Sequence, residues 1–343
     1  MPETIKVGTT ATPLPKIDFQ SFFSLKVSDL ASLGDQQYAG IHCADDAFGA
    51  EKIGLTEQFK EHAADYARKY AQTEFTKKVI KDATKNLAIP DDAVILDLGS
   101  GSGNTVIAAL DLFPSSSVIA IDLSEELLRI LQDYTRTKPE YSNRLFFMCQ
   151  DACRDTFRHE SIDLVLGAAI LHHLIDPSKA IIAALSALKP GGFAIFLEPF
   201  ENGAAILRLA IKEILRVNKG NSQPLEPAVE QFLKAIDYDY EVRTGTDKSA
   251  PIYRQIDDKW LFTRTYFEDC VRAAGASELS IHSINELEDQ FTCMIITLLR
   301  VGLERERDAL PQWALEVLYH FDFAFSRDLR KDLFLEACVL IRK

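Results

Sequence analysis

The stretch Leu96-Asp97-Leu98-Gly99-Ser100-Gly101-Ser102-Gly103-Asn104-Thr105-Val106 (LDLGSGSGNTV) joins an apolar run to an amphipathic run. Its glycines lack a Cβ and let the backbone approach a ligand closely, so a turn of this kind usually cradles a cofactor. In an open α/β sheet, ligands bind at the carboxyl ends of the strands, where the strand order reverses. The turn after a first buried strand is such a place, and the stretch therefore predicts a cofactor site.

The residues around these glycines decide which cofactor fits. A phosphate-binding loop needs Gly-x-x-x-x-Gly-Lys-Ser/Thr, and no lysine lies near Gly103. A dinucleotide fingerprint needs Gly-x-Gly-x-x-Gly, and its third glycine would fall at Asn104 or at Val106. Asp97, two places before the first glycine, would repel a pyrophosphate but suits a ligand end that carries an ammonium or sulfonium group. The pattern therefore favours a cationic ligand end at this turn.

Around this turn, the chain alternates between short apolar runs and helical segments. Strands are expected at 94–96, 117–121, 145–148, 162–166 and 193–197. Helices are expected near 104–112 and 124–134, the second with Ser124 as its N-cap. Runs this apolar indicate strands that are covered on both faces, so we predict an α/β fold with a parallel, doubly wound sheet.

Helical patterns dominate the rest of the chain. Apolar residues from 55 to 87 recur with helical spacing, which predicts a helix that packs on the core. After Glu198 we expect helices at 204–217, 227–236 and 264–274, strands at 278–284 and 334–341, and a helical stretch at about 290–330. The connection 201–257 is too long for an ordinary loop, and long excursions over a sheet edge are often lids.

Composition argues against several classes of protein. Of the 343 residues, 47% are hydrophobic, and the formal net charge is −13. Strong acidity disfavours nucleic acid as a partner, because nucleic-acid affinity depends on Lys and Arg that neutralise phosphates. The N-terminus MPETIKVGTT lacks the apolar core of a signal peptide, and no apolar cluster reaches the ~20 residues of a membrane span. The six scattered cysteines are typical of reduced thiols, so we expect a cytoplasmic protein with no membrane partner.

The motifs between residues 95 and 192 resemble those of the class I S-adenosylmethionine (SAM) dependent methyltransferases. ILDLGSGSG at 95–103 looks like the first motif of that family, and the others follow in order as Asp122, Asp151, GAAILHHL at 167–174 and LKPGG at 188–192. The match covers about residues 90–200 and is weaker at 258–288 and 332–343. The resemblance implies a Rossmann-like, seven-stranded sheet whose last strands are antiparallel, with SAM as the cofactor.

The resemblance also implies which residues bind the cofactor. Asp122 matches the acidic residue that binds both ribose hydroxyls, and its two acceptor oxygens suit the two donors of a diol. Asp151 matches the residue that accepts the adenine amino group, and small residues after the fourth strand line the methionine part. The residues expected to bind SAM are Asp97, Gly99, Ser100, Gly101, Asp122, Leu123, Asp151, Ala152 and Ala168.

Three residues are candidates for catalysis. His172 and His173 follow the fourth strand beside the expected methyl position, and either could act as the general base for a hydroxyl acceptor. His173 lines up with a histidine common in the small-molecule branches of the family; the alternative is that either ring bonds backbone groups. Glu198 is expected at the rim of the active site, where it orients the acceptor or is a solvated carboxylate. A metal-dependent branch has Glu-x-x-Glu-His, and because Ala169 and His172 replace those carboxylates, we expect no catalytic metal.

The expected organisation places a cofactor domain among helical additions. Its parts are an N-terminal helical region on the substrate side (1–89), the SAM-binding core (90–200), a lid (201–257), a core continuation (258–288), a helical insertion (289–331) and the last core strand (332–343). The additions are rich in aromatic side chains, which predicts a helical cap over a mostly apolar pocket. A homodimer face or extra core is the alternative for 290–330.

We therefore interpret the chain as a SAM-dependent methyltransferase for a small organic acceptor. The favoured reaction is O-methylation of a natural product or a sugar-like metabolite, with His173 as the base. C- or N-methylation of a small molecule remains an alternative, in which the protein needs only to position the acceptor. Methylation of a protein and a SAM-binding regulatory module without transfer are further alternatives.

Overall fold

The computed structural model describes residues 18–50, 52, 55–141, 143–284 and 287–343, and the N-terminal decapeptide discussed above lies outside them. A nine-stranded sheet forms its centre, in the order β1-β2-β5-β4-β3-β6-β7-β9-β8. The strands are β1 (Val27–Asp29), β2 (Ile41–Ala44), β3 (Val94–Leu98), β4 (Ser117–Asp122), β5 (Leu145–Cys149), β6 (Ile162–Ala168), β7 (Leu188–Pro199), β8 (Glu278–Ser283) and β9 (Glu336–Arg342). The predicted α/β, doubly wound fold is confirmed.

The strand order reverses at β3, the strand that leads into the glycine turn. β3 pairs in parallel with β4 on one side and with β6 on the other, and Asp97 stands opposite Ala120 and Leu166. Strands β5, β4, β3, β6 and β7 are all parallel, whereas β9 lies between β7 and β8 and runs antiparallel to both. The turn after β3 therefore opens at the switch point, where a crevice forms in folds of this kind.

Two short strands extend the sheet beyond the seven expected. β2 pairs in parallel with β5, with Ile41 opposite Phe147, and β1 pairs antiparallel with β2. β1 has only three residues and β2 only four, so neither is long enough to show a hydrophobic period. Their place at the edge comes from pairing with a strand about a hundred residues further along the chain.

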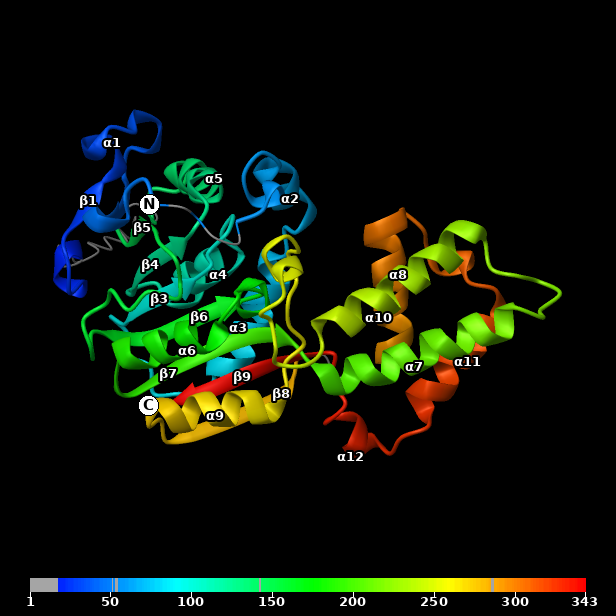
Figure 1. Cartoon of the computed structure of the whole chain (residues 1–343). Helices are drawn as coiled ribbons and strands as arrows, with labels where there is room; N and C mark the ends of the chain where they lie inside the picture. The colour runs from blue at the N-terminus through cyan, green and yellow to red at the C-terminus, as the bar shows by residue number, and fades with distance from the viewer. Residues whose placement is uncertain (1–17, 51, 53–54, 142, 285–286) are drawn as a thin grey trace, which may run out of the picture.

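Helices cover both faces of the sheet (Figure 1). One face packs against α3 (Thr73–Thr84), α4 (Asn104–Leu112) and α5 (Glu125–Arg136), and the other packs against α6 (Pro177–Ala187) and α9 (Arg264–Ala274). Ser124 caps α5, because its hydroxyl accepts a hydrogen bond from the backbone N–H of Leu127. Strands buried between two layers of helices explain the continuous apolar runs of the sequence.

The helix predicted over 55–87 is broken into three pieces. A 3-10 turn (Glu57–Phe59) and the helix α2 (Ala63–Lys69) precede α3. Between α2 and α3, the Asn104 side chain donates to the carbonyl of Tyr70 and accepts from the backbone N–H of Gln72. Asn104 thus satisfies the backbone groups at the break, and it anchors α2 to the end of the glycine turn.

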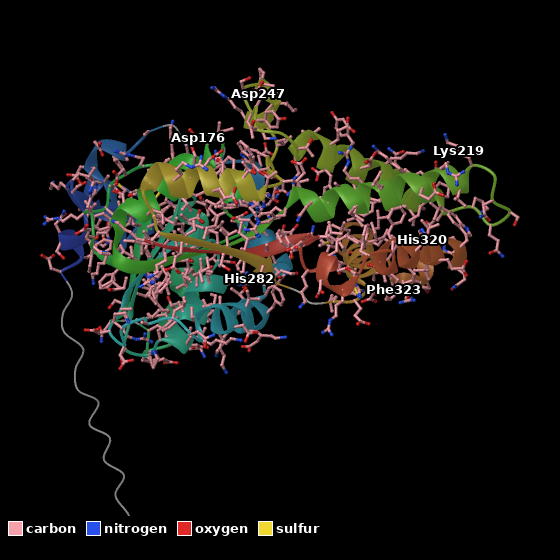
Figure 2. All side chains as sticks on the ribbon, turned by 90° about the horizontal axis from the view of Figure 1, so that it is seen from below. Asp176, Lys219, Asp247, His282, His320 and Phe323 are labelled. Carbon is pink, nitrogen blue, oxygen red and sulfur yellow. The ribbon has the colours of Figure 1, made fainter. Side chains whose placement is uncertain are left out.

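The two long insertions pack against each other as a helical lobe, made of α7 (Glu201–Asn218), α8 (Pro227–Arg243), α10 (Gln290–Leu303) and α11 (Gln312–Phe323), with the short α12 (Arg327–Arg330) after them. The lobe has its own apolar core, to which Leu207, Leu233, Phe291 and Leu318 belong. Figure 1 shows the lobe beside the sheet, beyond the ends of β7 and β9. Figure 2 shows Lys219, His320 and Phe323 on the lobe and Asp176 and His282 on the sheet part.

No helix in the part of the chain that the structure describes is long and apolar enough to cross a membrane.

Candidate active site

The glycine turn has a left-handed backbone at Gly99, Gly101 and Gly103, with φ of +64°, +50° and +105°. A Cβ on Gly99 would lie 2.4 Å from Cγ1 of Ile170, and one on Gly103 would lie 2.2 Å from Cδ1 of Leu131. A Cβ on Gly101 would meet no atom within 4 Å. Packing within the protein therefore requires glycine at the outer two positions, whereas Gly101 faces open space that a ligand can approach.

Asp97 is a buried carboxylate without a partner. Its side chain is 0% exposed, and neither oxygen has a hydrogen-bond partner among the described residues. Burial raises its pKa to about 7, although the nearby hydroxyls of Ser100 and Thr105 act to lower it. An unpaired buried charge is costly, so this position is suited to a cationic ligand group that would pair with it.

Asp122 ties the glycine turn to the end of the second parallel strand. Its Oδ2 accepts from the backbone N–H of Gly101 at 2.8 Å, and its Oδ1 accepts from that of Ser124, also at 2.8 Å. A carboxylate oxygen has two lone pairs, so each oxygen keeps one acceptor site for a ligand hydroxyl. Ser100 holds the turn itself, since its hydroxyl donates to the carbonyl of Asp97 at 3.1 Å.

Two of the remaining residues expected at the cofactor line a cavity of about 380 Å³ beside the ends of β4 and β5. Leu123 and Asp151 line it, together with Phe48 and with Lys52, which pairs with Glu125. Ala152 is buried next to Asp151, and Ala168 ends β6. The structure thus brings the residues at the ends of β3, β4 and β5 to one edge of the sheet, where residues between 43 and 50, together with Lys52, line the cavity.

Glu198 is buried, so the alternative of a solvated carboxylate was wrong. Its side chain is 1% exposed, and it accepts from the backbone N–H groups of Ile170 at 3.0 Å and Leu171 at 2.8 Å. Its Oε2 lies 2.6 Å from Nδ1 of His172. Because β7 is covered on both faces, its last carboxylate points inward and holds the loop after β6 in place.

His172 lies between two carboxylates. Its Nδ1 bonds Glu198, and its Nε2 is 3.5 Å from Oδ1 of Asp258. Burial alone would lower the pKa of His172, but the two carboxylates outweigh it and raise that pKa to about 9. The ring is therefore cationic near neutral pH when only protein groups surround it, and it is unsuited to accept a proton.

His173 presents one nitrogen to the protein and keeps the other free. Its Nδ1 is 3.1 Å from the carbonyl oxygen of Asp257 and 3.3 Å from Oδ1 of Asp258. Its Nε2 has no hydrogen-bond partner in the described ranges. Burial and the neighbouring charge of His172 lower the pKa of His173 to about 3. The ring is neutral at physiological pH, and an Nδ1–H that donates to Asp257 leaves the Nε2 lone pair available.

An aromatic wall, made of Phe59, Tyr66 and Tyr70, lies next to His173. The Phe59 ring is edge-on to His173 with 5.3 Å between ring centroids, and successive rings of the wall are 5.0 and 4.8 Å apart. Burial and the nearby Asp122 carboxylate raise the pKa of Tyr66. The wall therefore reaches from the cofactor side, at Asp122, to the candidate base.

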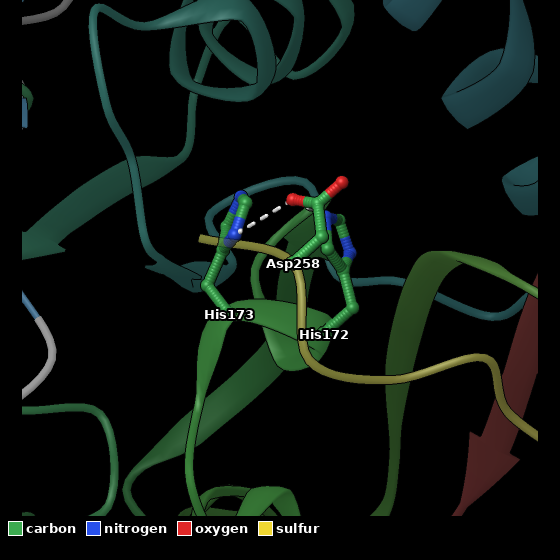
Figure 3. Close-up of side chains that lie close together, drawn as sticks. All are labelled: His172, His173 and Asp258. Carbon is green, nitrogen blue, oxygen red and sulfur yellow. Dashed lines mark ion pairs between the residues drawn. The ribbon is translucent and has the colours of Figure 1, made fainter. Parts of the chain in front are cut away.

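Asp258 and Arg243 also belong to the site, although no pattern in the sequence predicted them. Arg243, in the last turn of α8, lies with its Nη1 3.3 Å from Oδ2 of Asp258, and it is almost completely buried. Asp258 stands 85 positions after His173, in a polar stretch without a motif that marks it. Figure 3 shows its carboxylate between the two histidine rings. Only the return of the chain from the helical lobe brings these residues to the site.

Part of the chain resembles known methyltransferases. A family model described as "Methyltransferase domain" matches residues 96–196. The chain is 28% identical over 146 residues to malonyl-[acyl-carrier protein] O-methyltransferase of Methylococcus capsulatus, covering 43% of this chain and 52% of that protein. It is 26% identical over 119 residues to the ubiquinone/menaquinone biosynthesis C-methyltransferase UbiE of Geobacter sulfurreducens, covering 34% and 46%. The chain spans about half the length of these curated relatives.

A solved structure resembles most of the chain. It is a chain from the complex between the Haloferax volcanii Trm112 methyltransferase activator and a methyltransferase, with a TM-score of 0.50 and 15% sequence identity. The match covers 84% of this chain and 98% of that one. At this identity the likeness concerns the fold alone.

Proposed function

We propose that this chain, whose residues 96–196 form a class I SAM-dependent methyltransferase domain, methylates a small organic acceptor, with a hydroxyl as the favoured target. The observation that supports this best is the unpartnered carboxylate of Asp97 beside the open backbone of Gly101. A buried carboxylate with no protein partner fits the ammonium end of SAM, and the residue set around it fits the rest of that cofactor.

The family resemblance implies which residues would hold SAM, and their positions in the structure support these roles. Asp97 would pair with the ammonium, Asp122 would accept from the ribose hydroxyls, and Asp151 would face the adenine in the cavity next to Leu123. Bound SAM supplies an electrophilic methyl group. The left-handed backbone at Ala169, with a φ of +53°, lies at the expected methionine part, and strain at such a residue is common where a site is held rigid.

On the acceptor side, His173 would take the proton. Its Nε2 lone pair is free, its Nδ1 is held by Asp257, and the aromatic wall offers an apolar surface against which a ring or chain can pack. Orientation of the acceptor is the largest gain that a methyltransferase can supply, and a general base adds to it.

The direct test is formation of S-adenosylhomocysteine from SAM across a panel of hydroxylated, aminated and carbon-acid metabolites. We expect turnover with a hydroxylated member of the panel. Tight SAM binding without turnover on any metabolite would instead support a regulatory module. Turnover only on added protein would overturn the small-molecule proposal.

Asp122→Ala should weaken SAM binding about 10- to 100-fold, because hydrogen bonds to a charged group contribute about 1.5–3 kcal/mol. Asp163→Ala is the matched control. Asp163 also accepts from a backbone N–H, that of Val94 at 2.9 Å, but it lies at the opposite end of the sheet. Both variants should lose stability, and only the first should lose affinity in titration calorimetry. Equal affinities would remove Asp122 from the cofactor site.

Gly101→Ala should mainly weaken SAM binding, whereas Gly99→Ala should mainly destabilise the fold. Gly101→Ala adds a methyl group to open space, so the protein should fold with a cost of about 1 kcal/mol for the left-handed backbone and bind SAM at least about tenfold more weakly. Gly99→Ala clashes with Ile170 and should lower the melting temperature by clearly more. Unchanged SAM affinity in Gly101→Ala, measured by calorimetry, would contradict a close approach of the cofactor there.

A further inference from the structure

Three potential metal ligands converge beside the proposed acceptor site. They are Nε2 of His172, Nδ1 of His173 and Oδ1 of Asp258, and the ligand atoms of the three residues lie within 4.8 Å of one another. Figure 3 shows the two rings on either side of the carboxylate. The carboxylate oxygen is 3.5 Å from the first nitrogen and 3.3 Å from the second.

These separations suit a tetrahedral ion. Ligands that surround Zn²⁺ at about 2.0–2.2 Å lie about 3.4 Å apart along each edge of the tetrahedron. Both oxygen-to-nitrogen distances are close to that value without any movement of the backbone. The two imidazoles sit on adjacent residues, and their ring centroids are 4.1 Å apart.

The groups behind these ligands hold them in the orientation that an ion needs. Glu198 lies 2.6 Å from Nδ1 of His172, so an Nδ1–H can donate to its carboxylate, which fixes the tautomer whose Nε2 lone pair is available to an ion. A carboxylate in this position behind a histidine is typical of metal sites. Arg243 engages Oδ2 of Asp258, which leaves Oδ1 directed at the two rings.

We propose that His172, His173 and Asp258 form a binding site for a divalent transition-metal ion of the Zn²⁺ type. Two imidazoles and one carboxylate are the ligands that such ions prefer, whereas Mg²⁺ and Ca²⁺ prefer oxygen ligands. Three protein ligands leave a fourth position open. The Asp258 side chain is 39% exposed, so this position is reached from solvent or from a bound acceptor.

Occupation of this site would change the role of His173. A metal ion on Nδ1 displaces the proton from that nitrogen, and in the neutral ring the proton then sits on Nε2. The Nε2 lone pair is no longer free, so a bound ion and a general base at His173 exclude each other. This consequence rests on the proposed function, but the existence of the site does not.

The alternative is a purely protonic cluster. A cationic His172 between Glu198 and Asp258 would explain the same distances, with the proton on Nε2 of His172 in the place of the ion. The two descriptions differ in one measurable property, since only the metal site binds an ion through both histidines.

The experiment titrates the full-length, chelator-treated protein with Zn²⁺ in a calorimeter and with Co²⁺ in a spectrophotometer. We expect one equivalent to bind with micromolar or tighter affinity and the visible absorption of tetrahedral Co²⁺. His173→Gln and Asp258→Asn should each weaken binding by at least tenfold, and Glu198→Gln by about tenfold as a supporting residue. Circular dichroism of each variant checks that it is folded.

His159→Gln is the matched control, because His159 also neighbours a carboxylate, that of Asp155 at 3.7 Å, but is exposed and has no second histidine. It should bind Zn²⁺ as the unaltered protein does. Failure of the unaltered protein to bind one equivalent, or equal binding by folded His173→Gln, would overturn the site. Sulfur-to-cobalt charge-transfer absorption would also overturn it, since it would place the ion on the free cysteines. These measurements do not involve turnover, so their failure would leave the proposed methyl transfer standing.

Discussion

Asp97→Asn is expected to weaken SAM binding by about 100-fold, the largest effect on affinity that we predict. The substitution keeps the shape of the side chain and removes its charge. Loss of a charge-assisted hydrogen bond with an ammonium costs about 1.5–3 kcal/mol, and a 100-fold change corresponds to about 2.7 kcal/mol. Titration calorimetry with SAM measures the change directly.

The same substitution should not destabilise the cofactor-free protein at pH 8. Burial raises the pKa of Asp97 to about 7, so the folded state holds a proton that the unfolded state has already released. Stability is therefore lost as the pH rises from the ordinary carboxyl pKa to about 7. The asparagine of the Asp97→Asn variant cannot ionise. The variant should therefore lose less stability between pH 5 and pH 8 than the unaltered protein, as measured by thermal unfolding.

The affinity for SAM should depend on the same ionisation, but it should rise with pH where the stability of the cofactor-free protein falls. The charged carboxylate is the form that pairs with an ammonium, so affinity should fall as the pH is lowered below about 7, approaching tenfold per pH unit. The nearby Asp122, whose pKa is also raised by burial, contributes in the same direction. In Asp97→Asn the residual pH dependence should be shallower.

Asp322→Asn is the matched control for Asp97→Asn. Asp322 is also 0% exposed, but its carboxylate accepts from the backbone N–H groups of Phe291 at 2.8 Å and Thr292 at 3.2 Å. Removal of the Asp322 charge should lower the melting temperature and leave the affinity for SAM unchanged. If both variants bind SAM as the unaltered protein does, Asp97 does not contact the cofactor.

His173→Ala is expected to reduce turnover of a hydroxyl acceptor about 100-fold while SAM affinity stays the same. A positioned general base contributes about 10²–10⁴-fold. Because burial and His172 lower the pKa of His173 to about 3, it is a weak base, and the lower end of that range applies. Steady-state kinetics with the acceptor found in the panel gives kcat, and calorimetry gives the affinity for SAM.

A folded His173→Ala variant with unaltered kcat would exclude the base and favour C- or N-methylation, where the protein needs only to position the acceptor. His282→Ala serves as the control, because His282 lies on the edge strand β8 and bonds only Ser280 among the side chains described. Its turnover should match that of the unaltered protein. A loss of SAM affinity in His173→Ala would instead indicate a role in holding the loop after β6.

Much of the fold could be predicted because its elements carry local periodicity. The helices 104–112 and 264–274 begin and end where they were expected, and the five parallel strands contain the predicted runs. β1 and β2 were not predicted, because strands of three and four residues are too short to show an alternation of apolar and polar residues. The break between α2 and α3 was also not predicted, because it depends on the side chain of Asn104, more than thirty residues away.

The cofactor side of the site could be predicted for a related reason. Asp97, Asp122 and Asp151 each stand at or just after the carboxyl end of a parallel strand, and neighbouring parallel strands bring these ends together at one edge. The motif order along the chain therefore places these residues side by side. Glu198 also stands near the carboxyl end of a parallel strand. Its side chain is buried, however, because helices cover that strand on both faces.

The sequence alone determined the doubly wound fold and the switch point after Leu98, since these depend on local pattern, and the sign of the Asp97 charge led to the proposal of a cationic ligand end there. Tertiary structure alone decided the state of the two histidines. Glu198, Asp258 and Arg243 come from β7, from the chain returning to the sheet and from the helical lobe, and their fields act through space. Glu198 and Asp258 raise the pKa of His172, whereas burial and the neighbouring His172 lower the pKa of His173. The order of two adjacent identical residues in the sequence does not reveal this difference.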